Sequence, residues 1–367
     1  MKRKLTSLRR ALIVALGVAL LAVSGASAST DATSGTAGPA ATVAKAPTPK
    51  PATKARWARI TAAAKREGNV TIYTSQNPLF LADFAKRFEQ LYGIKVTINR
   101  QIDSVLTQQL TAEYGTGKVN ADVFVVATKG IVLGAQQAQN RWAVDAVGPA
   151  LFHPQFNRKL FAGPGKAHIV GAALLGVGWN TAFWPQGIRD MPDVLNPRLK
   201  GRVGVIIPSA FSIIDWYKWL EENWGSDFIR RLAAQEPKLY VSSLPMTQAV
   251  ASGEIAVGTF VAASAVDLKE AGAPIDFRVL RGKKTGAWNA PWWLMVMRSA
   301  PHPNAAQLVT NFMFTREGQA LVHKRTGSPL KGVRNTFYVT PRKQSLANST
   351  PAKVAEFQRF WDSLFRK

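Results

Sequence analysis

The amino-acid sequence predicts an α/β protein with two lobes, each a mostly parallel sheet flanked by helices. Between residues 70 and 130, short apolar segments alternate with amphipathic ones, the pattern of parallel strands connected by helices. A second series with the same alternation begins at Val203. Roughly 300 residues follow the N-terminal 56, and this length favours two lobes over one.

The first 28 residues have the organisation of a secretory signal peptide. A basic head that includes Lys2, Arg3 and Lys4 precedes an apolar run that is shorter than the roughly 20 residues needed to span a bilayer. Residues 26–28 have the small-x-small pattern of a cleavage site. We therefore expect residues 1–28 to be removed on export, with an uncleaved membrane anchor as the alternative.

The segment 29–56 is rich in Ala, Thr, Pro and Lys and has no hydrophobic period, so we expect a disordered linker. The chain has no cysteine, which excludes disulfide bonds, thiolate metal sites and the lipid-modified cysteine of a lipoprotein. An exported protein without disulfides depends on its hydrophobic core for stability, and this chain is long enough to form one.

The positive charge of the chain is large but dispersed. There are 47 Lys and Arg against 22 Asp and Glu, a formal net charge of +25 at pH 7. Basic residues such as Arg198, Lys200 and Arg202 are scattered rather than gathered into the blocks typical of nucleic-acid arms. This distribution fits either a solvated basic surface or attraction of an anionic solute. Because no nucleic-acid-binding motif is present, we expect no nucleic-acid partner.

In the first lobe, a polar side chain follows each predicted strand. Strands are expected at residues 70–73, 96–98 and 122–126, and helices at 57–66, 79–91 and 105–114. The polar residues at the strand exits are Ser75, Gln76, Asn77, Ser104 and Thr128. Each of them can be explained as a helix cap, with Asp103 or Ser104 capping the third of these helices. Because the carboxyl ends of parallel strands meet at one edge, a shared ligand-binding role is the alternative.

The second lobe is expected after a long apolar strand at residues 169–179. Its predicted strands lie at 203–207 and 255–260, and its helices at 213–222, 227–235, 247–251 and 266–271. A strand at 292–297 then returns to the first lobe. Further helices are expected at 304–314, 317–326 and 351–365.

Residues 195–211 have the pattern of a site for a small anion. The predicted strand at 203–207 ends in Pro208, Ser209 and Ala210, and Ser212 lies where the next helix begins. Backbone N–H groups at a helix start bind anions without any catalytic side chain. We expect Ser209, Ala210 and Ser212 to form such a site. The candidate charged partners are Arg100, Lys129 and Arg202.

The order of these motifs resembles the periplasmic solute-binding proteins of ABC transporters with the type 2 fold. Within them it is similar to the extracellular solute-binding family 1 and its ferric-binding-like subgroup. The matching segments are 68–75, 84–96, 121–124, 193–203, 253–258, 269–274, 300–306 and 316–319. The resemblance covers about residues 67–335. It implies two lobes joined by crossing strands, with a ligand cleft at the hinge.

The resemblance also implies a division of the chain and a function. Lobe 1 would comprise residues 57–170 and 288–335, and lobe 2 residues 171–287, with the C-terminal helix 351–367 packing on one lobe. The implied protein is a periplasmic, monomeric receptor without enzymatic activity or cofactor. It would close on one small-molecule solute and deliver it to an ABC permease in the inner membrane.

The sequence departs from the ferric members of that subgroup at the expected iron ligands. A histidine in the first exit loop is replaced by Asn77, a carboxylate after the third strand by Ala127, and a tyrosine pair by residues 260–264. Ferric iron prefers anionic oxygen donors, so we expect no metal site. The retained anion pocket at Ser209 then predicts an organic anion such as a carboxylate, phosphonate or phosphate ester. A ferric-iron, polyamine or thiamine receptor is the alternative within the fold.

The aromatic residues have two interpretations, core packing or an apolar wall of the cleft. Phe260 and Trp288 are the ligand-binding candidates, and Trp288, in a predicted loop, is expected to be the most exposed to ligand. A secreted α/β hydrolase is the alternative from another class. It would need a nucleophile beside a base or a carboxylate pair. No Gly-x-Ser-x-Gly elbow or zinc helix motif is present, so no catalytic residue is predicted.

Overall fold

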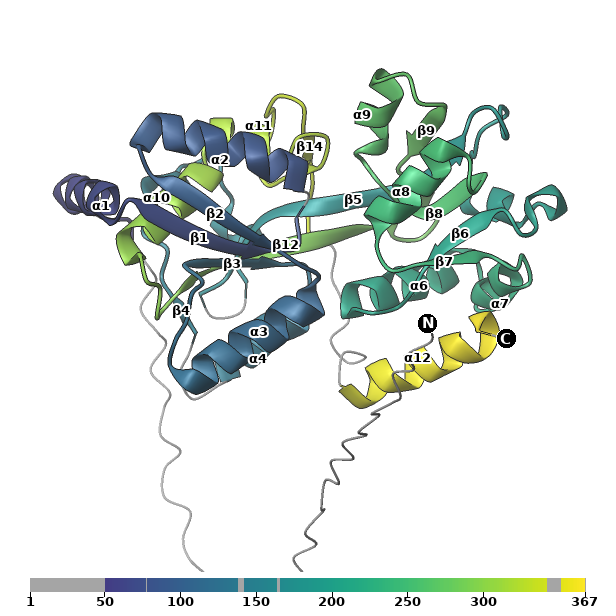
Figure 1. Ribbon diagram of the computed structural model, residues 1–367, viewed down its shortest axis with the longest axis horizontal. Helices are drawn as coiled ribbons and strands as arrows, with labels where there is room; N and C mark the ends of the chain where they lie inside the picture. Colours follow the sequence, from purple (N-terminus) through teal and green to yellow (C-terminus); the bar gives the residue numbers. More distant parts are fainter. Residues whose placement is uncertain (1–49, 77, 138–141, 164–165, 342–350, 367) are drawn as a thin grey trace, which may run out of the picture. The chain divides into compact units, whose positions relative to one another are not determined.

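The computed structural model describes residues 50–76, 78–137, 142–163, 166–341 and 351–366 (Figure 1). The predicted signal peptide and the predicted linker up to residue 49 lie outside this part of the chain. Within it, no helix combines the length and the apolar character needed to cross a membrane. The described residues from 50 onward belong to one compact unit.

The main sheet is mixed and has the strand order β2-β1-β3-β12-β5-β8-β6-β7. The strands of this path are β1 (Asn69–Thr74), β2 (Lys95–Arg100), β3 (Val123–Val126), β5 (His168–Asn180), β6 (Val203–Ile206), β7 (Lys238–Tyr240), β8 (Val257–Ala262) and β12 (Asn289–Met297). Short strands pair at its margins or form a separate hairpin: β4 (Ala143–Val144), β9 (Ile275–Arg278), β10 (Arg281–Gly282), β11 (Gly286–Ala287), β13 (Gly327–Ser328) and β14 (Phe337–Tyr338).

Two parallel groups of strands make the two lobes. In lobe 1, β1 pairs in parallel with β2 and β3; in lobe 2, β6 pairs in parallel with β7 and β8. The long strands β5 and β12 pair antiparallel with each other, and they join the two groups, because β12 pairs antiparallel with β3 and β5 pairs antiparallel with β8. This is the predicted fold class, and the strands predicted at 169–179 and 292–297 are these two crossing strands. The lobe boundaries predicted at residues 170 and 288 lie in or beside them and stay predictions.

Helices cover both faces of each parallel group (Figure 1). Those of lobe 1 are α1 (Lys54–Glu67), α2 (Pro78–Tyr92), α3 (Asp103–Thr116), α4 (Lys129–Gln137), α5 (Arg158–Phe161), α10 (Pro303–Met313) and α11 (Arg316–Val322). Those of lobe 2 are α6 (Phe211–Trp224), α7 (Phe228–Ala233), α8 (Ser243–Ser252), α9 (Ala265–Glu270) and α12 (Pro351–Phe365). Short 3-10 turns lie at Pro149–Phe152, Met191–Leu195 and Pro197–Leu199.

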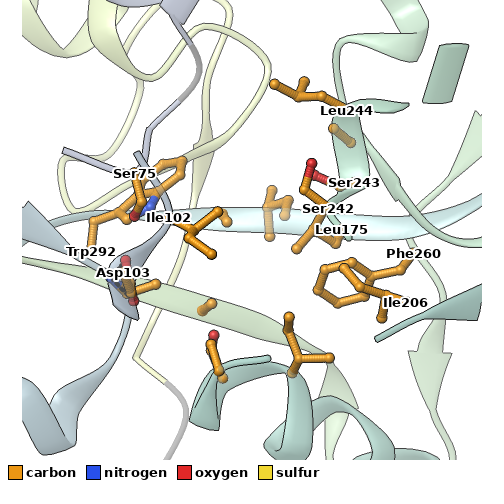
Figure 2. A pocket seen from close by; sticks show the side chains of 18 of the residues that line it. Ser75, Ile102, Asp103, Leu175, Ile206, Ser242, Ser243, Leu244, Phe260 and Trp292 are labelled. Atoms are coloured by element: carbon orange, nitrogen blue, oxygen red, sulfur yellow. Dashed lines mark hydrogen bonds between the residues drawn. The ribbon is translucent and has the colours of Figure 1, made fainter. Parts of the chain in front are cut away.

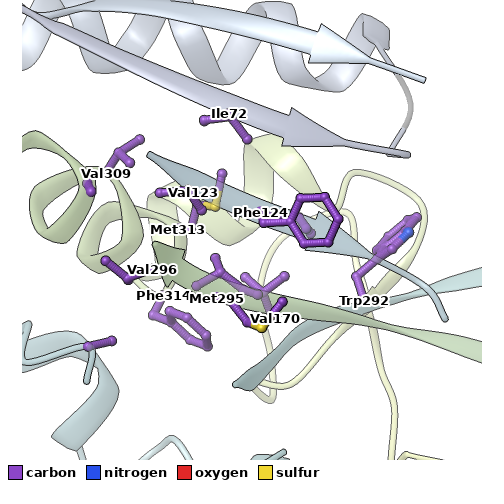
Figure 3. Packing of buried hydrophobic residues seen from close by; sticks show 14 of the residues in the cluster. Ile72, Val123, Phe124, Val170, Trp292, Met295, Val296, Val309, Met313 and Phe314 are labelled. Atoms are coloured by element: carbon purple, nitrogen blue, oxygen red, sulfur yellow. The ribbon is translucent and has the colours of Figure 1, made fainter. Parts of the chain in front are cut away.

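Each lobe has its own hydrophobic core. In lobe 1, side chains from β1, β3, β12 and α10 interlock, among them the labelled Phe124, Met295 and Met313 (Figure 3). In lobe 2, the fully buried Trp216 and Trp219 of α6 stack with ring centroids 4.9 Å apart. The C-terminal helix α12 belongs to this second core, because Trp361 is 0% exposed and packs near Tyr217. Burial of these apolar side chains stabilises each lobe.

Several elements differ from the expected ones at their ends. Helix α1 begins at Lys54 rather than at residue 57, because the Thr53 side chain accepts a hydrogen bond from the Arg56 N–H and caps the helix. Helix α8 begins four residues before the expected start, at Ser243. Strands β7 and β9 were not predicted. Both are short and contain polar residues, so their sequences lack the apolar alternation by which strands are recognised.

Candidate functional site

A cavity of about 160 Å³ lies where the two lobes face each other across β5 and β12. Figure 2 shows residues of lobe 1, such as Ser75 and Asp103, opposite residues of lobe 2, such as Ser243 and Phe260. The described lining residues are Ser75, Phe80, Arg100, Ile102, Asp103, Ala127, Ala173, Leu174, Leu175, Ile206, Ser209, Ala210, Ser212, Ile213, Val241, Ser242, Ser243, Leu244, Phe260, Ala262, Ala263, Ser264, Trp288, Ala290, Trp292 and Thr326.

The cavity brings together six of the ten predicted ligand-binding residues. These six are Ser75, Ser209, Ala210, Ser212, Phe260 and Trp288. Three others, Gln76, Ser104 and Thr128, do not line it. Asn77 lies outside the described residues. Of the four described strand-exit candidates of lobe 1, only Ser75 lines the cavity, so the strand-exit pattern does not identify which side chains at that edge face it.

Thr128 and Gln76 are turned to intramolecular partners. The Thr128 hydroxyl donates a 2.6 Å hydrogen bond to Oδ2 of Asp103, which also accepts from the Ala127 N–H at 3.1 Å. The expectation that Asp103 or Ser104 caps α3 is wrong: the N-cap is Ile102, and the Asp103 carboxylate ties the end of β3 to the start of α3 instead. Gln76 is 1% exposed, and its Oε1 accepts from the Thr74 hydroxyl at 3.3 Å.

Two helices of lobe 2 begin at the cavity without a side-chain cap. The N-cap of α6 is Ala210 and that of α8 is Ser242, and in neither does a described side chain accept a capping hydrogen bond. Uncapped N–H groups at a helix start carry partial positive charge and need an acceptor. The residues that precede and open these helices line the cavity, so an anion bound there would supply that acceptor.

Two side chains form hydrogen bonds with the backbone of the segment that precedes α6. Gln358 of α12 donates through Nε2 to the Pro208 carbonyl at 2.9 Å. The Tyr217 hydroxyl of α6 donates to the Ile206 carbonyl. Burial raises the pKa of Tyr217 above its ordinary value, so the hydroxyl stays a donor. These bonds fix the backbone just before Ser209 and Ala210 and so orient the start of α6.

Arg100 supplies the positive charge of the cavity. It lies at the end of β2 and is half-buried, and its Nε has no hydrogen-bond partner in the described part of the chain. Burial lowers the pKa of this guanidinium, which the nearby charge of Asp103 partly offsets. Of the other two candidate partners, Lys129 lies over the Trp293 ring and Arg202 over the Phe183 ring, and neither lines the cavity.

The aromatic wall is more rigid than expected. Trp288 is 1% exposed, so the prediction that it is the most exposed to ligand is wrong. Its Nε1 donates to Asp215 at 2.9 Å, and its ring packs against Trp216 and Phe260 at centroid distances of 5.4 and 5.5 Å. Trp288 and Phe260 thus present a fixed apolar surface to the cavity.

The sequence analysis did not identify the two serines at the start of α8 that line the cavity. Ser242 and Ser243 follow β7, which is only three residues long and was not predicted. Pro245 could have indicated the true start of this helix. Proline is well tolerated in the first turn of a helix, so its position is consistent with a helix that begins at Ser243. Ser264 was also missed as a lining residue, although it stands at the N-cap of α9.

The charged chemistry of the cavity is limited. Among its described lining residues, Arg100 and Asp103 are the only ionisable side chains, and the Asp103 carboxylate is already bonded to Thr128 and Ala127. No serine of the lining is recorded in a hydrogen bond to a described histidine or carboxylate that could act as its base. The arrangement is suited to binding an acceptor-rich group.

Comparison with protein families gives one match over most of the chain. A model for a family described as "Bacterial extracellular solute-binding protein" matches residues 70–325. This range contains both lobes' parallel strands, β5, β12 and most of the residues that line the cavity. It ends before α12.

Solved structures with the same fold include binding proteins with different ligands. Iron-bound HitA from Pseudomonas aeruginosa is 20% identical, with a TM-score of 0.59 over 81% of this chain and 98% of that one. AfuA from Actinobacillus pleuropneumoniae, with exogenous fructose-6-phosphate bound, is 20% identical, with a TM-score of 0.64 over 82% and 99%. The substrate-binding protein of an ABC transporter from Agrobacterium tumefaciens is 13% identical, with a TM-score of 0.67 over 83% and 97%. At these identities the similarity establishes the fold, that of type 2 periplasmic binding proteins.

Proposed function

Because the chain belongs to the family of bacterial extracellular solute-binding proteins, we propose that it captures a small organic anion in the periplasm and delivers it to an ABC permease. The solute would be a carboxylate, a phosphonate or a phosphate ester. No chemical step on the solute is part of this function. The protein would act as a monomer that closes its two lobes around the ligand.

The observation that carries the proposal is the state of Arg100. Its guanidinium lines the cavity, its Nε is buried without a hydrogen-bond partner, and no described carboxylate lies within ion-pair distance of it. The charge of Asp103 offsets only part of the cost of burying this cation, so a ligand that supplies negative charge would stabilise it further. The uncapped starts of α6 and α8 face the same space and favour the same sign of charge.

The donor set of the cavity disfavours the alternative ligands. Ferric iron requires several anionic oxygen donors, and the described lining offers one carboxylate, Asp103, which already accepts two hydrogen bonds. A polyamine or thiamine would bring positive charge next to Arg100. AfuA was solved with fructose-6-phosphate, which supports anions of the phosphate-ester class as a starting panel.

Lobe closure would follow from the distribution of these groups. Arg100 and Ser75 belong to lobe 1, whereas the starts of α6 and α8 belong to lobe 2. An anion that contacts both sets has more hydrogen bonds when the lobes approach each other. The ligand therefore favours the closed state by its differential affinity, with β5 and β12 as the hinge.

The proposal is tested by thermal unfolding of the ligand-free exported protein against a panel. Phosphate, methylphosphonate, acetate, spermidine and ferric iron would be titrated in parallel, and hydrolysis of p-nitrophenyl phosphate and acetate would be followed. We expect an anion to raise the Tm by roughly 5 °C at a hundredfold excess over its Kd, with no hydrolysis. Stabilisation by spermidine or iron alone, or turnover of an ester, would contradict the proposal.

A further inference from the structure

The polar groups that line the cavity are almost all hydrogen-bond donors or hydroxyls. Arg100 has only N–H donors, and the starts of α6 and α8 present backbone N–H groups. The described lining contains no side chain of Asn, Gln, Glu, His or Lys. Its one carboxylate, Asp103, is occupied by the Thr128 hydroxyl and the Ala127 N–H. The remaining acceptors are seven Ser and Thr hydroxyls, four of which, Ser209, Ser212, Ser242 and Ser243, lie at the starts of α6 and α8, where the anionic group would bind.

The rest of the lining is apolar and comes from the crossing strands and the aromatic wall. Strand β5 contributes Ala173, Leu174 and Leu175, and β12 contributes Ala290 and Trp292. Figure 2 shows Leu175, Ile206 and Phe260 side by side on the lobe 2 side of the cavity. These surfaces offer no partner for a hydroxyl or an amine of a ligand.

The aromatic part of this lining is held in place. Trp292 is 7% exposed and stacks on His323 with ring centroids 5.5 Å apart. Phe260 is 5% exposed and packs against Trp216 and Trp288. Rings packed in this way present an apolar surface to the cavity. The free space, about 160 Å³, is comparable with the roughly 150 Å³ of an apolar cavity that holds one benzene ring.

We propose that the solute is an acid whose anionic group is its only polar group, with a hydrocarbon body of about one ring or a short chain. This rests on the proposed function, because the anionic group would occupy the donors at Arg100, α6 and α8. The body would lie against Ala173, Ala290 and the aromatic wall. An amine, or a row of sugar hydroxyls, on the part of the body that faces these apolar surfaces would lose hydrogen bonds to water that the alanine side chains and the aromatic rings cannot replace.

Three phosphonates of equal size that differ in one group, together with a larger sugar phosphate, test this inference. Calorimetric titration would compare propylphosphonate with 2-aminoethylphosphonate, in which an ammonium replaces a methyl group, and with 2-hydroxyethylphosphonate and glucose 6-phosphate. We expect propylphosphonate to bind at least tenfold more tightly than 2-aminoethylphosphonate. Lengthening from methyl- to propylphosphonate should raise affinity roughly fourfold for each buried CH₂.

A substitution that fills the apolar part of the cavity provides a second test. Ala173→Leu should weaken phenylphosphonate binding by tenfold or more and leave methylphosphonate binding within about threefold, since only the larger body reaches Ala173. The matched control is Ala58→Leu on the exposed face of α1, which should change neither affinity.

The outcomes separate the inference from the proposed function. Tighter binding of 2-aminoethylphosphonate or glucose 6-phosphate than of propylphosphonate would overturn the inference and leave an anion receptor. Equal loss of both phosphonates in Ala173→Leu would also overturn it. Binding of none of these anions would remove the proposed function, and the inference with it.

Discussion

Arg100→Gln should weaken anion binding without weakening the fold. In the described structure the guanidinium has an unpartnered Nε and no ion pair, and burial lowers its pKa. Removing this charge therefore removes a desolvation cost that is larger than the attraction to Asp103 that is lost with it. We expect the Tm of the ligand-free protein to stay the same or to rise.

The effect on binding follows from the bonds that the anion would lose. A hydrogen bond to a charged group contributes about 1.5–3 kcal/mol, which corresponds to roughly a 10- to 150-fold increase in Kd. Binding should not vanish, because the starts of α6 and α8 still face the cavity. The assay is calorimetric titration of methylphosphonate, together with thermal unfolding of the ligand-free protein.

The control is Arg59→Gln, which removes the same charge from the exposed face of α1. If both substitutions weaken binding equally, the effect comes from net charge and not from the cavity. If Arg100→Gln lowers the Tm by several degrees and leaves affinity unchanged, Arg100 is a structural residue and the reasoning is refuted.

Three further predictions concern the helix start, the C-terminal helix and pH. Ser209→Asp should abolish anion binding, because it places a negative charge in the cavity. The uncharged variant Ser209→Asn should bind the anion with a Kd within about tenfold of that of the parent protein. If a titration gives Ser209→Asp the same affinity as the parent protein, the site is wrong. Trp361→Ala should lower the free energy of urea unfolding by about 3–5 kcal/mol, and a loss no larger than that of Phe337→Ala, an exposed ring, would show that α12 does not pack as described. Burial lowers the pKa of His323 to about 3, below the roughly 6.5 of a histidine in the unfolded chain. The stability that comes from keeping this histidine neutral is therefore fully present above pH 6.5 and is lost as the pH falls toward 3. From pH 7.5 to 5, the parent protein should therefore lose about 2 kcal/mol more unfolding free energy than His323→Gln; equal losses in urea titrations would contradict the buried neutral state.

The fold was largely predictable because its pattern is local. The alternation of apolar and amphipathic segments marks β1, α2, β2, α3 and β3, and glycines at the helix ends set their lengths. The order of motifs also indicated the family, and that prediction is confirmed by the match over residues 70–325. Strand β7 was not predicted, because a strand of three partly polar residues is too short to show a period-2 hydrophobic pattern. The helix start at Ser243 was missed as a consequence.

The site was only partly predictable because its geometry depends on distant contacts. Thr128 occupies the expected strand exit, but Asp103, 25 residues earlier, takes its hydroxyl. Trp288 is in a segment that looks like a loop, yet Asp215, 73 residues away, fixes its indole inside the core. Arg100, Lys129 and Arg202 were equivalent candidates in sequence, and only their tertiary surroundings distinguish Arg100.

Native mass spectrometry of the exported protein, purified without a denaturing step, tests the central claim most directly. The account predicts a protein ion that carries one small acid, released as an anion on activation, and lost or strongly depleted in Arg100→Gln but not in Arg59→Gln. A bound mass that corresponds to ferric iron or to a polyamine, or an acid retained equally in Arg100→Gln, would contradict it.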